Sequence, residues 1–193
     1  MANGFDTPDD VTGISAALVD NKYSFVIKYC QSSGNFPAKR FSHQMVSELH
    51  AAGIKVGFCS EVQNNPEYFT AKEGADDATI VADYFELLGV PKLIPCFAAY
   101  DLDIDPSQVI AYATAFHATI KDAGWLAGCY ASGAVCSALK AAGLAAYTWL
   151  SNATGWQGYD AWLSQADIVQ HVGSVLGLNS DPDTASSLDG WSW

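Results

Sequence analysis

Apolar positions along the chain fall into short runs that alternate with amphipathic stretches. The short runs are rich in Val, Ile, Phe and Tyr and predict strands, because parallel strands that are covered on both faces are apolar almost throughout. The stretches between them repeat apolar residues at helical spacing and predict helices. The predicted strands lie within residues 3–6, 23–30, 51–59, 92–101, 122–130, 141–149 and 166–172.

A repeated pattern marks three of these units. In each, a helix-like stretch runs into Ala-Gly and then into a strand, so the glycine is expected in the left-handed conformation that ends a helix. These helix-ending glycines are Gly53, Gly124 and Gly143. Two further glycines, Gly57 and Gly128, lie inside strands, where we expect room for a small residue only.

Strands and helices alternate through the chain with no Ser/Gly linker and no low-complexity tract. This order predicts a single α/β domain over residues 1–193, with one parallel sheet of seven strands and a potential eighth. Two architectures remain open, a doubly wound sheet and a small (β/α) barrel, since a typical TIM barrel needs about 250 residues. Neither GxGxxG nor GxxxxGK(S/T) occurs, which argues against a nucleotide-binding open sheet.

The charge balance narrows the range of partners. The 193 residues include 9 basic and 21 acidic ones, for a net charge of -12, which argues against nucleic acid and anionic membranes. A neutral or cationic ligand fits better, and we expect a monomer. No apolar run reaches the roughly 18 residues of a membrane span. The first residues, MANGFDTPDD, lack the basic start and apolar core of a signal peptide.

The five cysteines contain no CxxC pair, and four of them lie in or beside predicted strands. We therefore expect reduced thiols buried in the core.

Carboxylates gather at the ends of the predicted strands. Asp6 ends the first strand, and the stretch CFAAYDLDIDPS places Asp101 and Asp103 at the end of the fourth. In a barrel these ends form one rim, where barrel enzymes keep their active sites, so the acids would meet in one mouth. Asp101 and Asp103, two apart on an extended strand, would point to the same side. Other acids follow the third and the last strand, namely Glu61, Asp181 and Asp183.

Some acids at these positions have a purely structural interpretation. Asp105 precedes a proline at the start of a helical segment and is interpreted as an N-cap. Asp183, which precedes TASS, is either a cap or a site residue. Asp6, Asp101 and Asp103 have no such explanation.

Paired carboxylates suit glycoside hydrolysis, which needs one protonated acid for the leaving oxygen and one ionised group beside the sugar carbon. Like charges a few Å apart raise one pKa and so create this division. The candidate catalytic residues are therefore Asp6, Asp101 and Asp103. A divalent metal on the DxD pair, as in sugar-nucleotide transferases, is a minor alternative; otherwise neither metal nor cofactor is expected.

Aromatic residues suit sugar rings, because their flat faces match the C–H faces of the sugar. The stretch TWLSNATGWQGYDAWL (148–163) contains Trp149 at a strand end and Trp156 shortly after it, although Trp is also common in cores. Lys28 lies in the second strand. The candidate substrate-binding residues are Glu61, Trp149, Trp156, Asp181, Asp183 and Lys28.

An ordered set of motifs runs along nearly the whole chain. It comprises GFDTPDD, VIKYC, EGADDATIVADYFELLGVP, FAAYDLD, GWLAGCYAS, GLAAYTWLS with GW shortly after, and ADIVQHVG followed by DPD. In this order the motifs resemble the glycoside-hydrolase-like domain of unknown function that is related to family 25 lysozymes. The resemblance implies a small, irregular TIM-like (β/α) barrel and a peptidoglycan or related polysaccharide substrate.

In family 25 lysozymes an Asp ends strand one, a D-x-E motif ends strand four, and another Asp follows the last strand. By position these match Asp6, the Asp101–Asp103 pair, and Asp181 or Asp183. The proton donor of those lysozymes is Glu, whereas position 103 is Asp, which is one methylene shorter.

Two functions therefore remain open. The first is a lysozyme-like glycosidase with Asp103 as the acid, Asp101 as the stabiliser and Asp6 as their partner. The second is a carbohydrate-binding or cell-wall-associated module that has lost catalysis. A glycan substrate implies an extracellular or cell-wall location, yet no signal peptide is visible, so the sequence leaves the localisation open.

Overall fold

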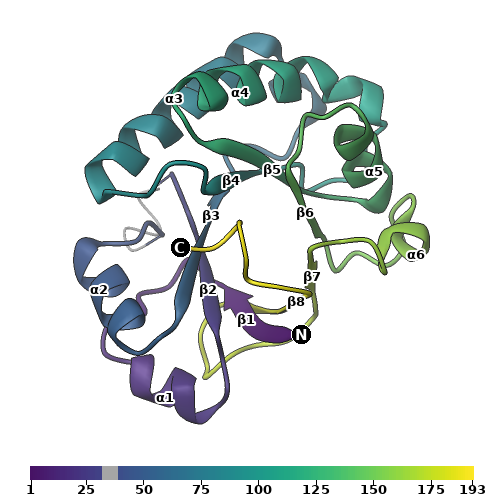
Figure 1. Ribbon diagram of the computed structural model, residues 1–193. Coiled ribbons are helices and arrows are strands. Elements are labelled where there is room, and N and C mark those ends of the chain that lie inside the picture. Colours follow the sequence, from purple (N-terminus) through teal and green to yellow (C-terminus); the bar gives the residue numbers. More distant parts are fainter. Residues whose placement is uncertain (32–38) are drawn as a thin grey trace.

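Eight strands form a closed barrel in the order β1 to β8, with the helices around its outside (Figure 1). The computed structural model describes residues 1–31 and 39–193. The predicted small TIM-like barrel is thereby confirmed, and the open sheet is excluded. The strands are β1 (Ala2–Asp6), β2 (Phe25–Tyr29), β3 (Lys55–Ser60), β4 (Pro95–Ala99), β5 (Leu126–Ala131), β6 (Tyr147–Leu150), β7 (Ile168–Gln170) and β8 (Asp181–Ala185).

The helices follow the strands in the alternating order that the sequence predicted. Gly53, Gly124 and Gly143 adopt positive φ values of 76°, 96° and 70°, which confirms their predicted place at helix ends. The α-helices are α1 (Ser15–Asp20), α2 (His43–Ala51), α3 (Ala71–Leu88), α4 (Ile110–Asp122), α5 (Gly133–Ala141) and α6 (Tyr159–Trp162), and the one-turn 3₁₀ helices are η1 (Pro66–Tyr68) and η2 (Pro106–Gln108).

The last strand runs against the others, so the prediction of a purely parallel sheet was wrong. β1 to β7 pair in parallel, whereas β8 is antiparallel to both β1 and β7. We had placed Asp181 and Asp183 after the last strand, but they lie within β8. The sequence of β8, DPDTA, contains a proline and two acids and therefore has the composition of a loop. Because β8 is reversed, its first residue lies at the rim formed by the last residues of the other strands.

β4 ends at Ala99, two residues earlier than predicted. Leu102 N donates to Tyr100 O at 2.9 Å, which closes a tight turn around Asp101. The prediction that Asp101 and Asp103 share one side of an extended strand was therefore wrong, because the chain turns between them.

Aromatic side chains fill the barrel interior. Phe25, Phe97 and Trp149 lie inside it, and Trp191 reaches in from the C-terminal segment, with its ring centroid 5.1 Å from that of Phe25. Gly128 makes room for this layer, because a Cβ there would lie 2.6 Å from Phe97 Cδ1.

A larger apolar cluster joins the outer face of the strands to the helices. The five cysteines are free and buried, which confirms that prediction.

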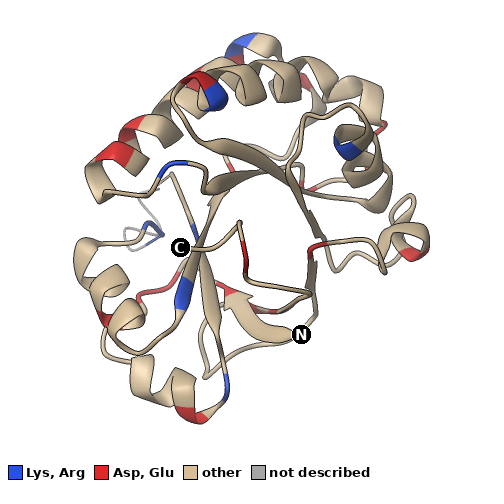
Figure 2. Cartoon of the chain, viewed as in Figure 1, with Lys and Arg blue, Asp and Glu red and all other residues tan. Residues whose placement is uncertain are grey.

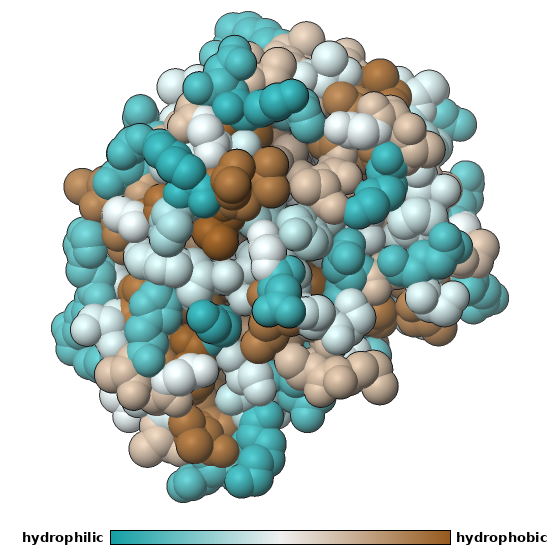
Figure 3. All heavy atoms as spheres, viewed as in Figure 1, coloured by the Kyte–Doolittle hydropathy of each residue, from teal (hydrophilic) through white to brown (hydrophobic). Residues whose placement is uncertain are grey.

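The surface mixes hydrophilic and hydrophobic residues on the face seen in Figure 3. Asp and Glu lie on helices and loops all around the barrel (Figure 2). Across residues 1–31 and 39–193, no helix has both the length and the apolar character needed to cross a membrane.

Candidate active site

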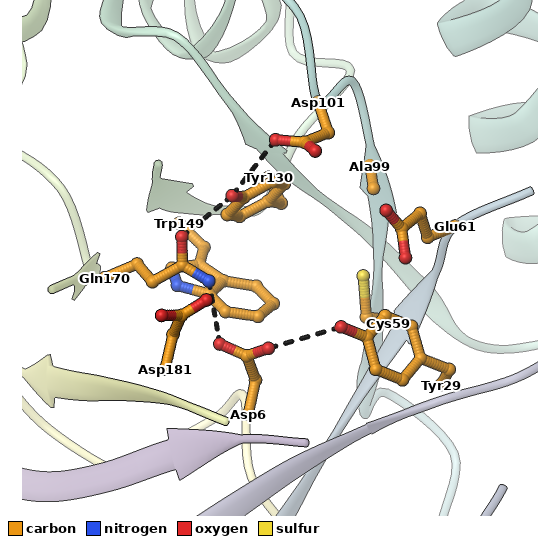
Figure 4. Close-up of a pocket in the computed structure, with 10 residues that line it drawn as sticks. All are labelled: Asp6, Tyr29, Cys59, Glu61, Ala99, Asp101, Tyr130, Trp149, Gln170 and Asp181. Carbon is orange, nitrogen blue, oxygen red and sulfur yellow. Dashed lines mark hydrogen bonds between the residues drawn. The ribbon is translucent and has the colours of Figure 1, made fainter. Parts of the chain in front are cut away.

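A cavity of about 110 Å³ lies at the rim of the barrel, where each of the eight strands, or the loop directly after it, contributes to the wall (Figure 4). Four of the lining residues are acids. The lining residues are Asp6, Tyr29, Cys59, Glu61, Ala99, Asp101, Tyr130, Trp149, Gln170 and Asp181. Five of the sequence candidates thus meet in one pocket: Asp6, Glu61, Asp101, Trp149 and Asp181.

A second cavity of about 210 Å³ adjoins the first and shares four of its residues, Asp6, Tyr29, Glu61 and Asp181. Its wall also includes Lys39, whose Nζ lies 3.2 Å from Glu61 Oε2 in an ion pair. The two cavities together offer a ligand more room than the inner pocket alone.

Asp6 lies deep in the pocket, with 5% of its surface exposed. Tyr29 Oη donates to Asp6 Oδ1 at 3.2 Å, and Gln170 Nε2 donates to Asp6 Oδ2 at 2.8 Å. Burial raises the pKa of Asp6 from 3.8 to about 7, since a buried carboxylate loses its hydration. The hydrogen bond from Gln170 opposes this rise in the pKa, and the negative charge of Asp181 adds to it.

Asp101 lies across the pocket and is half-buried. Its pKa is raised, first by burial and then by the negative charge of Glu61. Asn64 Nδ2 donates to Asp101 Oδ2 at 3.4 Å, and the Tyr130 hydroxyl lies 3.3 Å from Asp101 Oδ1. The same hydroxyl donates to Gln170 Oε1 at 2.8 Å. Gln170 and Tyr130 therefore connect the two acids in one chain of hydrogen bonds (Figure 4).

Asp181 lies at the rim, and Asp183 lies one layer deeper on the same face of β8, because side chains two apart on a strand share a face. Burial raises the pKa of Asp181, and it raises that of Asp183 well above its usual range. Trp149 Nε1 donates to Asp183 Oδ1 at 2.9 Å beneath the pocket. Asp183 is therefore placed to orient Trp149 rather than to line the cavity.

Besides Asp183, three further sequence candidates lie outside both cavities. Asp103 is exposed, and its Oδ1 accepts from Gln157 N at 3.1 Å. Trp156 is half-buried in the loop after β6. Lys28 points to the opposite face of β2 from Tyr29, where its Nζ donates to Thr7 O at 3.2 Å and to the carbonyl of Asp9.

Asp105 is an N-cap, as predicted, since its Oδ1 accepts from Ser107 N at 2.9 Å.

Sequence reasoning missed three polar residues of the pocket: Tyr29, Tyr130 and Gln170. Each ends, or nearly ends, a strand whose place had been predicted, so the same rule that selected Asp6 could have selected them. Their residue types gave no signal, because Tyr and Gln carry no charge and Tyr is frequent in strands.

Within the part of the chain that the structure describes, no group of three or more His, Cys, Asp or Glu side chains is arranged to hold a metal ion.

Several solved structures have the same fold as this chain. The Tat-secreted protein Rv2525c of Mycobacterium tuberculosis, solved with HEPES and with L-tartrate, matches with a TM-score of 0.83 at 17% identity, over 100% of this chain and 98% of that one. The catalytic domain of endolysin ply40, from bacteriophage P40 of Listeria monocytogenes, matches with a TM-score of 0.64 at 14% identity, over 97% and 94%.

The modular autolysin LytC of Streptococcus pneumoniae, solved with a synthetic peptidoglycan ligand, matches with a TM-score of 0.59 at 12% identity, over 94% of this chain and 46% of LytC. At these identities the likeness shows the fold alone. No curated protein matches the chain.

The chain also matches the model of a protein family. Residues 16–184 match the family described as Rv2525c-like, glycoside hydrolase-like domain. This range spans most of the chain and confirms the resemblance that the motifs had suggested. The chain belongs to the Rv2525c-like, glycoside hydrolase-like domain family.

Proposed function

We propose that this protein is a glycoside hydrolase that cleaves peptidoglycan or a related polysaccharide with the acids of the rim pocket. The observation that carries the proposal is the pair Asp6 and Asp101, two carboxyl groups with raised pKa values that line one cavity and share one hydrogen-bond chain. Family membership supports it, and so does the likeness of the fold to an endolysin domain and to LytC, which was solved with a peptidoglycan ligand.

Cleavage of a glycosidic bond needs a proton donor for the leaving oxygen and a negative charge beside the sugar carbon. Asp101 takes the role of donor, in place of Asp103, because Asp101 lines the cavity and Asp103 does not. Asp6, which accepts two hydrogen bonds, stabilises the positive charge that develops on the sugar. No covalent nucleophile is assigned.

The remaining pocket residues bind the sugar in this proposal. Trp149 offers an apolar wall, and its ring is held by Asp183 from below. Glu61 and Asp181 face the same space and accept hydrogen bonds from sugar hydroxyls.

The second candidate function is a carbohydrate-binding or cell-wall-associated module without catalysis. The position of Asp103 favours it. This residue stands where the related lysozymes have their Glu donor, yet it is exposed and bonded to a backbone N–H. A chain that has lost its donor could keep the sugar pocket and bind without cleaving.

Release of reducing ends from peptidoglycan and from a panel of polysaccharides tests the first function. Wild type should release them, and Asp101→Asn and Asp6→Asn should each lower the rate by about 10²–10⁴-fold, which is the usual contribution of acid–base groups. Asp122 is an exposed acid at the end of α4, so Asp122→Asn is the matched control and should retain the wild-type rate. Cleavage that persists at the wild-type rate in Asp101→Asn would refute the assignment.

A further inference from the structure

Gln170 connects Asp6 to Asp101 through hydrogen bonds, directly to Asp6 and through Tyr130 to Asp101. It is the last residue of β7 and is buried, with 5% of its surface exposed. Its Nε2 donates to Asp6 Oδ2 at 2.8 Å, and its Oε1 accepts from Tyr130 Oη at 2.8 Å. An amide has its donor and its acceptor at fixed ends, so its orientation gives the chain of hydrogen bonds a direction.

A third contact fixes that orientation. The backbone N of Asn152 donates to Gln170 Oε1 at 3.4 Å. A backbone N–H can only donate, so turning the amide over would set its NH₂ group against a second donor. Gln170 therefore keeps its oxygen toward Tyr130 and its NH₂ group toward Asp6.

The direction continues to Asp101. The Tyr130 hydroxyl has one proton, and it uses this proton in the 2.8 Å bond to Gln170. Toward Asp101 Oδ1, at 3.3 Å, the hydroxyl is then free to accept from a protonated Asp101, whereas an ionised Asp101 has to share the one Tyr130 proton with Gln170.

We propose that Gln170 is a positioning residue that biases the proton toward Asp101. Its bond to Asp6 favours the ionised form of Asp6, and its bond from Tyr130 draws the hydroxyl proton away from Asp101, which favours the protonated form of Asp101. This inference rests on the proposed function for its role in catalysis, since a protonated Asp101 is the donor assigned there. The arrangement of hydrogen bonds itself requires no substrate.

The other charged groups around the pocket do not make this distinction. Glu61, beyond β3, and Asp181, on β8, each raise the pKa of both Asp6 and Asp101. Gln170, in contrast, makes opposite contacts with the two sides, because it donates to Asp6 and accepts from the partner of Asp101. The remaining titratable or charged groups that face the pair are Tyr29 on β2, Cys59 on β3, Asp183 on β8 and Lys39, which pairs with Glu61.

The test is a pH titration of the aspartate carboxyl carbons by NMR in the whole protein, comparing wild type with Gln170→Met. Met has a similar length but lacks both the amide donor and its oxygen. We expect the pKa of Asp6 to rise above its wild-type value of about 7, because the bond from Gln170 lowers it. We expect the pKa of Asp101 to fall, because Tyr130 becomes free to donate to its carboxylate. Gln165→Met, an exposed glutamine replaced in the same way, is the matched control and should change neither.

Shifts of the two pKa values in opposite directions support the inference, whereas shifts in the same direction, or none, overturn it. If Gln170→Met does not fold, Tyr130→Phe provides the second test. This variant leaves the bond from Gln170 to Asp6 in place and removes the acceptor for the Asp101 proton, so the pKa of Asp101 should fall while that of Asp6 stays unchanged. An unchanged or higher pKa of Asp101 in that variant overturns the inference.

The titration needs no substrate and separates this inference from the proposed function. Opposite shifts in a protein that cleaves no glycan would support the role of Gln170 and refute the hydrolase.

Discussion

Asp6, the last residue of β1, is paired directly with Asp181, the first residue of the antiparallel strand β8. The two acids come from opposite ends of the chain and meet at one rim only because β8 is reversed. This pairing places a negative charge beside a carboxyl group that is already buried, and both effects raise the pKa of Asp6. The site therefore holds its acids at a cost in stability, and that cost depends on pH.

The first prediction concerns this pH dependence. Asp6 has a raised pKa in the folded state, so its contribution to stability is fully present below 3.8 and is lost as the pH rises to about 7. The gap between these values is worth roughly 4 kcal/mol. Asp6→Asn removes this dependence. The free energy of unfolding of this variant, measured with urea, should therefore increase relative to that of wild type as the pH rises from about 4 to about 8.

Asp122→Asn serves as the control, because this acid is exposed and lies outside the pocket, so the variant should not show the gain in stability that is expected for Asp6→Asn. A constant difference between Asp6→Asn and wild type would show that the carboxyl titrates at its ordinary pKa.

The second prediction separates the two acids of the DxD pair. Asp103 is exposed and bonded to Gln157 N, so Asp103→Asn keeps the shape of the site and should retain most of the rate of glycan cleavage. Asp101→Asn should lower kcat by about 10²-fold or more, because it removes the proton donor. Kinetics on one soluble glycan fragment would measure both. The reverse result would return the donor role to Asp103.

The third prediction concerns the packed interior. A Cβ at Gly128 would lie 2.6 Å from Phe97 Cδ1, so Gly128→Ala forces the ring to move and should lower the free energy of unfolding by about 1–3 kcal/mol. Gly155→Ala is the matched control, because nothing lies within 4 Å of a Cβ there. Equal stability of the two variants would contradict the packing described for β5.

The fourth prediction concerns the thiols. Burial raises the pKa of Cys59, Cys96 and Cys136 well above the usual range, and all five cysteines are buried. The folded protein should therefore react slowly with a thiol reagent such as Ellman's reagent, because the thiolate is the reactive form. All five should react at once in denaturant. Rapid reaction of one thiol in the folded protein would contradict its burial.

The sequence predicted seven of the strands well because their pattern is local, whereas the barrel, rather than an open sheet, was implied by the family resemblance. Seven strands and the glycines that end the helices follow from apolar runs and from residues with special backbone freedom. β8 was missed because its proline and two acids are typical of a loop, and only pairing with β1 and β7 makes it a strand.

Only part of the site could be predicted. A position at the end of a strand predicts that a residue lies at the rim, but it does not predict whether its side chain points into the barrel or away from it. Lys28 and Tyr29 illustrate this limit, since they are neighbours on β2 and point to opposite faces. Asp101 and Asp103 illustrate a second limit, because a tight turn at Tyr100–Leu102 separates two acids that a longer strand would have kept together. The direction of a side chain and the residue at which a strand gives way to a turn both depend on strand register and on tertiary contacts, which one sequence does not reveal.

The most direct test of the central claim measures binding and cleavage in the same sample. Wild-type protein is incubated with purified insoluble peptidoglycan, the bound fraction is recovered by sedimentation, and reducing ends are counted in the supernatant. The account predicts both binding and release of reducing ends, with release lost and binding kept in Asp101→Asn. Wild-type protein that binds and releases nothing would contradict the hydrolase and leave the carbohydrate-binding module.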